Sequence, residues 1–136
     1  MFKSYKELQI WTRGMDVVEK TYKITEDFPK KEMFGLTSQM RRSAVSIPIN
    51  IAEGWARNSP KSFIQFLRIS EGSLAELETL VRISERLNYI STEKSTILQR
   101  ELDILAKMMK SLMKAIKASD QTSKQPSIQV TKQPSN

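Results

Sequence analysis

The chain has 136 residues and a formal net charge of +7, and it contains neither cysteine nor histidine. Without cysteine it can form no disulfide, thiolate nucleophile or zinc–thiolate site, and without histidine it lacks the commonest metal ligand and general base. The length suits one domain. Only four glycines and five prolines are present, which argues against a fold of many strands and turns and favours an all-helical one.

The N-terminal residues show no basic segment followed by an apolar one, so no signal peptide is expected. No window approaches the roughly 18 consecutive apolar residues of a transmembrane helix. The sequence therefore predicts a cytoplasmic protein that does not enter a membrane.

A first helix is predicted over residues 8–26, because large apolar side chains recur there at helical spacing. These are Leu8, Trp11, Met15, Val18 and Tyr22. Pro29 ends the pattern, since the residue before a proline is disfavoured in helical geometry. Gly14 lies inside this helix at a cost of up to about 1 kcal/mol against alanine. It indicates either a close contact with a neighbouring backbone or simple tolerance.

A second helix is predicted from Leu36 or Thr37 onward. Its main apolar stripe consists of Leu36, Met40, Ala44, Ile47, Ile51 and Trp55. Pro48 lies within this stripe and removes one backbone hydrogen bond, so it predicts a bend or, alternatively, two short helices. A polar row along the flank is either a functional groove or the solvated side of a bundle. This row consists of Arg42, Ser46, Asn50, Glu53 and Arg57.

Ser59 followed by Pro60 predicts the start of a third helix, with the serine as N-cap and the proline at the first helical position. The helix is expected to extend to Leu87, and Asn88 suits a left-handed C-terminal cap. Two apolar stripes follow this helix. They comprise Phe63, Leu67, Leu74, Leu77 and Val81 on one side and Phe66, Ile69, Leu80, Ile83 and Leu87 on the other. Small residues between the stripes would let a neighbouring helix approach closely, namely Ser70, Gly72, Ser73 and Ser84.

Glu76 falls in line with the second of these stripes, so we expect its carboxylate to be buried. An unpaired buried carboxylate is costly, and a buried ion pair with Arg41 or Arg42 on the preceding antiparallel helix would satisfy it and fix the helix register. The alternative is a general acid with Glu53 or Glu78 as its partner. That alternative lacks a third group to orient the carboxyls.

A fourth helix is predicted after Ser91 and Thr92, both of which can cap it. Its apolar residues form the most regular heptad pattern of the chain. They are Leu98, Leu102, Leu105, Met109, Leu112 and Ile116. The composition then becomes polar, which predicts two parts: a helical bundle domain over residues 1–118 and a disordered tail over residues 119–136.

Four lysines recur at spacings of three and four near the end of this helix and form a basic stripe on one face. They are Lys107, Lys110, Lys114 and Lys117. A polyanion such as RNA could bind there. The stripe is also typical of a solvated outer face. Lysines near a helix C-terminus stabilise the helix through its dipole, without any partner.

Seven short blocks together resemble the four-helix-bundle family encoded in intervening sequences of bacterial 23S rRNA genes. The blocks are Phe34-Gly35-Leu36, Arg41-Arg42, Ser46-Ile47-Pro48, Asn50-Ile51-Ala52-Glu53-Gly54, Phe66-Leu67, Gly72-Ser73 and Glu76-Leu77-Glu78. The resemblance covers roughly residues 5–117. It implies an antiparallel up-down-up-down bundle and a ring-like homopentamer. It also implies kinship with the accessory protein of diversity-generating retroelements, which binds a reverse transcriptase and nucleic acid. The family has no established biochemical activity.

Two classes of function follow from these observations. The first is a non-enzymatic, homo-oligomeric bundle that binds structured RNA or a nucleic-acid-processing partner through its basic residues, or serves as a scaffold without nucleic acid. The candidate residues are Arg13, Arg41, Arg42, Arg57, Lys107, Lys110, Lys114 and Lys117. The second is a carboxylate enzyme with a metal held by Glu53, Glu71, Glu76 and Glu78. The di-iron bundle motif requires histidine, so we expect no catalytic residue, metal or cofactor.

Overall fold

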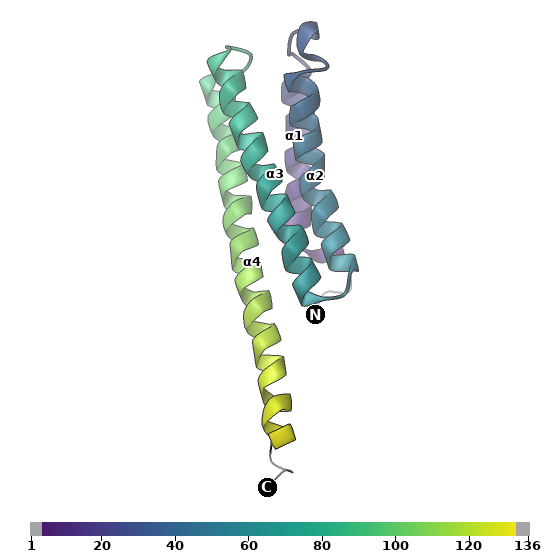
Figure 1. Ribbon diagram of the computed structural model, residues 1–136. Coiled ribbons are helices and arrows are strands. Elements are labelled where there is room, and N and C mark those ends of the chain that lie inside the picture. Colours follow the sequence, from purple (N-terminus) through teal and green to yellow (C-terminus); the bar gives the residue numbers. More distant parts are fainter. Residues whose placement is uncertain (1–3, 133–136) are drawn as a thin grey trace.

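Four helices pack side by side in this computed structural model, with neighbouring helices antiparallel (Figure 1). They are α1 (Gln9–Thr25), α2 (Leu36–Ala56), α3 (Pro60–Arg86) and α4 (Thr92–Lys132), with short 3-10 turns η1 (Tyr5–Glu7) and η2 (Lys30–Glu32). The structure describes residues 4–132, with side chains for residues 4–121 except Glu7. Within this part, α1 contacts α2 and α4, α3 contacts α2 and α4, and the diagonal pairs do not meet. The predicted all-helical bundle is confirmed.

The starts of all four helices and the ends of α1 and α3 lie within one or two residues of the predicted ones, because the capping residues act as their chemistry suggests. The Ser59 hydroxyl accepts a hydrogen bond from the Ser62 amide at the start of α3. The Ser91 hydroxyl accepts one from the Lys94 amide at the start of α4. Asn88 has a φ of 62°, the left-handed conformation predicted at the end of α3.

Pro48 does not divide the second helix, since α2 is one continuous α-helix with Pro48 inside it. The proline ring is buried against α1 beside Gly14. A Cβ atom built on Gly14 would lie 3.4 Å from Ile47 Cγ2 and 3.5 Å from Pro48 Cβ. Gly14 therefore lies at a close helix contact, where an extra methyl group would be in ordinary van der Waals distance.

The α1 side of the core agrees only in part with the predicted apolar stripe. Leu8 is buried, whereas Met15 and Tyr22 of the same stripe are exposed. The buried face of α1 instead carries small residues, namely Gly14, Val17, Thr21 and Thr25, together with Ile10 near its start. The hydroxyls of Thr21 and Thr25 donate to the carbonyl oxygens of the residues four positions earlier. These hydrogen bonds offset the free-energy cost of burying the hydroxyls.

The α2–α3 contact is the closest in the bundle, and small residues on α3 make it so. Ser70, Ser73 and Ser84 are buried as predicted, and the Ser70 hydroxyl donates to the Ile47 carbonyl at 2.9 Å. Gly54 of α2 lies so near α3 that an added Cβ would be 2.6 Å from Phe66 Cβ. Gly72 was expected at the same contact but faces open space.

Both tryptophans are half-buried against the core. Tyr5 of the N-terminal turn packs edge-on against them, with ring centroids 5.4 Å from Trp11 and 6.4 Å from Trp55. Neither indole is therefore a freely exposed surface for association.

At the opposite end of the bundle, Glu32 joins three segments. One carboxylate oxygen accepts from the Leu36 amide at the start of α2, and the other accepts from the Tyr89 hydroxyl at 3.0 Å. This hydrogen bond is the main reason that the pKa of Tyr89 is raised above 10.0; desolvation and the charge of Glu32 act in the same direction.

Helix α4 is the longest element and continues past the end where α3 begins (Figure 1). Its backbone is helical to Lys132, whereas the sequence predicts a disordered tail over residues 119–136. A helix already nucleated can extend without tertiary contacts, because each added residue closes one hydrogen bond. Residues 133–136 lie outside the described residues. No described helix has the length and hydropathy that a membrane span requires.

Candidate functional site

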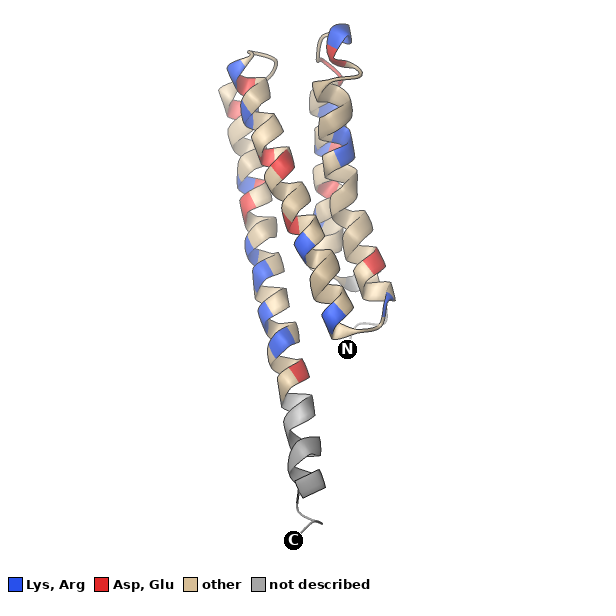
Figure 2. Ribbon diagram, viewed as in Figure 1, with Lys and Arg blue, Asp and Glu red and all other residues tan. Residues whose placement is uncertain are grey.

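The predicted basic stripe lies on the outer face of α4, where Lys107, Lys110, Lys114 and Lys117 are all exposed. In Figure 2, positively charged segments follow one another around the middle of α4. The opposite face of α4 packs Leu105 and Met109 into the core. Lys110 Nζ lies 3.0 Å from Glu71 Oε2 of α3, so one of the four charges is already paired.

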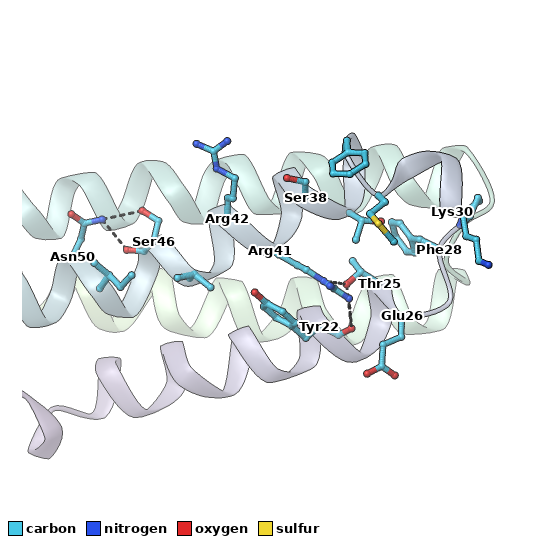
Figure 3. A pocket seen from close by; sticks show the side chains of 16 residues that line it. Tyr22, Thr25, Glu26, Phe28, Lys30, Ser38, Arg41, Arg42, Ser46 and Asn50 are labelled. Carbon is cyan, nitrogen blue, oxygen red and sulfur yellow. Dashed lines mark hydrogen bonds between the residues drawn. The ribbon is translucent and has the colours of Figure 1, made fainter.

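Arg41 is bound to α1 and takes a structural role. Its Nε donates to the Thr25 hydroxyl at 2.9 Å, a terminal nitrogen donates to the Tyr22 carbonyl at 3.5 Å, and the guanidinium lies 4.4 Å from the Tyr22 ring centroid (Figure 3). A cation at the C-terminal end of a helix is favoured by the helix dipole. Arg41 therefore anchors α2 to the last turn of α1.

The other candidate arginines are exposed but do not extend the lysine stripe. Arg42 projects from α2 away from Arg41 (Figure 3), and α2 does not contact α4. Arg57 follows α2, where it lies 3.7 Å from Glu53 and 5.1 Å from the Phe66 ring centroid. Arg13 lies on α1. The eight predicted residues thus belong to several surfaces, of which only the α4 stripe is a continuous row.

Glu76 is exposed, so the predicted buried ion pair was wrong. Among the described residues, no ion pair joins Glu76 to Arg41 or Arg42. The buried face of α3 consists instead of leucines, Val81 and serines. Ile69 and Ile83, on the same stripe as Glu76, are exposed as well. Because that stripe lies beside the core, Glu76 needs no cation to offset desolvation.

The polar row of α2 contributes both to the helix contact and to an open pocket. The Ser73 hydroxyl of α3 donates to the Ser46 hydroxyl at 2.8 Å, and the Asn50 amide donates to the same hydroxyl and to the Ser46 carbonyl. A pocket of about 340 Å³ beside them is lined by Gln39, Ser43 and Ser46 and by the charged Arg42 and Glu76. Ser46 and Asn50 of the row are therefore structural, whereas its three charged residues face solvent.

A larger groove runs between α1 and α2 and has a volume of about 890 Å³ (Figure 3). Tyr22 lines its α1 side, Arg41, Val45 and Ile49 line its α2 side, and Phe34 precedes α2. Phe34 is 94% exposed. The sequence signal was the polar row of α2, which supplies Arg42, Ser46 and Asn50 to the lining of this groove.

In the part of the chain that the structure describes, no three carboxylates form a group that could hold a metal ion. The four glutamates of the metal-enzyme alternative are thus not brought together as a ligand set. They are Glu53, Glu71, Glu76 and Glu78.

Comparisons with known proteins identify relatives of the whole bundle. Residues 6–111 match the model of a family described as 23S rRNA-intervening sequence protein. Among solved structures, the chain is similar to a protein of unknown function from the S23 ribosomal protein family of Bacteroides thetaiotaomicron. That structure is 23% identical, with a TM-score of 0.69, and the match covers 77% of this chain and 98% of that chain. No curated protein matches the chain.

Proposed function

The chain belongs to the 23S rRNA-intervening sequence protein family, and from this premise we propose that it is a non-enzymatic, homo-oligomeric bundle that binds structured RNA through the outer face of α4. One observation carries the proposal. Lys107, Lys114 and Lys117 are exposed in a row, and none has a carboxylate partner among the described residues. Such a row can neutralise successive phosphates and release their counterions.

Exposed apolar residues on two sides of the bundle support the homo-oligomer. Ile69, Ile83 and Leu87 are exposed on α3, and Ile97 and Ile104 are exposed on α4. An interface between subunits would remove these side chains from water. Because the two sets lie on different helices, a contact between one set and the other would be head-to-tail, the kind of contact that closes into rings. The homopentamer of the family resemblance is one such ring.

Assembly would strengthen RNA binding, because every subunit presents the same lysine row. Weak contacts at single subunits add up when one RNA reaches several of them. The modest charge of one chain, +7, is therefore compatible with measurable affinity. Sequence readout is not expected, since lysines contact phosphates as point charges.

The test combines mass and binding. Light scattering on the purified full chain should give a multiple of 15.7 kDa, and a fluorescently labelled RNA hairpin should bind at low salt. Replacing Lys107, Lys114 and Lys117 by alanine should weaken binding strongly without changing the mass.

The matched control removes the same charge from lysines that do not form a row, namely Lys23, Lys61 and Lys94, all exposed. Equal loss in both triple variants would show that net charge alone binds RNA, which contradicts a site on α4. An assembled wild type that binds no RNA would favour the protein scaffold without nucleic acid.

A further inference from the structure

The groove between α1 and α2 has the dimensions of a helix-binding site. Its α2 wall extends from Thr37 to Asn50, which is about 20 Å at 1.5 Å per residue. An amphipathic helix of about 14 residues would span this length. The groove is open along one side and lies between two packed helices (Figure 3).

Its apolar residues are more exposed than the fold requires. Phe34 is 94% exposed, Met33 55% and Ile49 53%, and Tyr22 is also exposed. These side chains come from α1, from the loop before α2 and from α2 itself, so they form one patch although they are distant in sequence. Rimmed apolar patches of this kind mark sites for another molecule.

The charges on the rim are mainly positive. Lys30, Arg41 and Arg42 line the groove, and Glu26 is the one carboxylate among its lining residues. None of the three cations pairs with a carboxylate among the described residues. Arg41 is already fixed by Thr25 and Tyr22, so an incoming carboxylate would meet a positioned charge at little entropic cost.

Nucleic acid and a second copy of the chain fit a groove with an apolar patch and a positive rim less well. Phosphates would use the rim but leave Met33, Val45 and Ile49 without contacts. A second copy carries the same net positive charge, +7, whereas the rim favours a negative partner.

We propose that this groove binds an amphipathic helix of a partner protein whose apolar face is flanked by acidic residues. The apolar face would lie on Val45 and Ile49 with Phe34 closing one end, in the spacing of three and four residues that helices use in such grooves. The flanking carboxylates would pair with Lys30, Arg41 and Arg42. This surface is separate from the lysine row of α4, so its test does not depend on RNA binding.

The experiment uses two labelled peptides of about 14 residues that share one leucine stripe and differ only in their flanks, glutamate in one and lysine in the other. Fluorescence anisotropy with the full chain should show binding of the acidic peptide and at least tenfold weaker binding of the basic one. Ile49→Asp and Arg42→Glu should each weaken the acidic peptide at least tenfold. The matched controls outside the groove, Met15→Asp on α1 and Arg100→Glu on α4, should leave its affinity unchanged.

Each other result overturns the proposal. Failure of both peptides to bind, or equal binding of the two, would remove the acidic helix as occupant. A fall in solution mass caused by Ile49→Asp would assign the groove to a second copy. Loss of RNA binding in Arg42→Glu together with unchanged peptide affinity would assign it to nucleic acid.

Discussion

The α2–α3 contact and the outer face of α4 use polar residues in opposite ways. At the α2–α3 contact, Ser70 and Ser73 donate hydrogen bonds to α2, and Gly54 leaves no room for a methyl group. On the outer face of α4, Lys107, Lys114 and Lys117 project into solvent. The difference teaches which polar residues maintain the fold and which are free to bind a partner.

The largest effect on stability is expected from Gly54→Ala. The new Cβ would lie 2.6 Å from Phe66 Cβ, and overpacking of this kind costs about 1 to 3 kcal/mol. Gly72→Ala is the control, because it adds the same methyl group to a helix interior with nothing within 4 Å. It should stabilise by up to about 1 kcal/mol through helix propensity. Urea unfolding midpoints that move in the same direction would contradict the close contact.

Ser70→Ala should have the next largest effect. It removes the hydrogen bond to the Ile47 carbonyl within the fully buried contact, which is expected to cost about 1 kcal/mol. Thr79→Ala is the control, since the exposed Thr79 hydroxyl bonds only within its own helix. A Ser70→Ala midpoint no lower than that of Thr79→Ala would show that packing alone holds α2 to α3.

The polar link between α1 and α4 should contribute less to stability than the buried hydrogen bonds between α2 and α3, because it is the exposed ion pair between Lys20 and Glu101. A double-mutant cycle with alanine at both positions should give a coupling of less than about 1 kcal/mol. The coupling should shrink as salt is added. A larger, salt-insensitive value would place this pair among the structural contacts.

Glu76→Ala should have the smallest effect, within about 0.5 kcal/mol of wild type, because its carboxylate is exposed. Arg42→Ala should likewise be mild, and the two changes should add. Strong non-additivity in the unfolding free energies would restore the ion pair that the sequence predicts.

The sequence predicts the helices better than it predicts their buried faces. Caps act through residues next to one another in the chain, so Ser59 and Asn88 could be interpreted locally. Which face of a helix is buried depends on the side chains that the neighbouring helix presents to it. The apolar spacing favoured Met15 and Tyr22 for the core, whereas the structure buries Gly14, Thr21 and Thr25.

Glu76 was misplaced for the same reason. The neighbouring stripe of serines and leucines is the buried one, and its serine hydroxyls can bond to their own helix, as Ser84 does with the Leu80 carbonyl. The lysine row was predictable because helical spacing alone defines it. The α1–α2 groove was predictable only in the polar row of α2, since its other residues meet that row only after α1 and α2 pack.

The salt dependence of RNA binding tests the central claim most directly. For a labelled RNA duplex, the logarithm of the binding constant should fall linearly with the logarithm of the salt concentration, with a slope of about −0.9 per phosphate neutralised. Replacing Lys107, Lys114 and Lys117 by alanine should make the slope shallower by about 2 to 3 per subunit in contact with the duplex, while the control triple variant at Lys23, Lys61 and Lys94 keeps the wild-type slope. An α4 variant with the wild-type affinity and slope would contradict the assignment of the outer face of α4 as the nucleic-acid site.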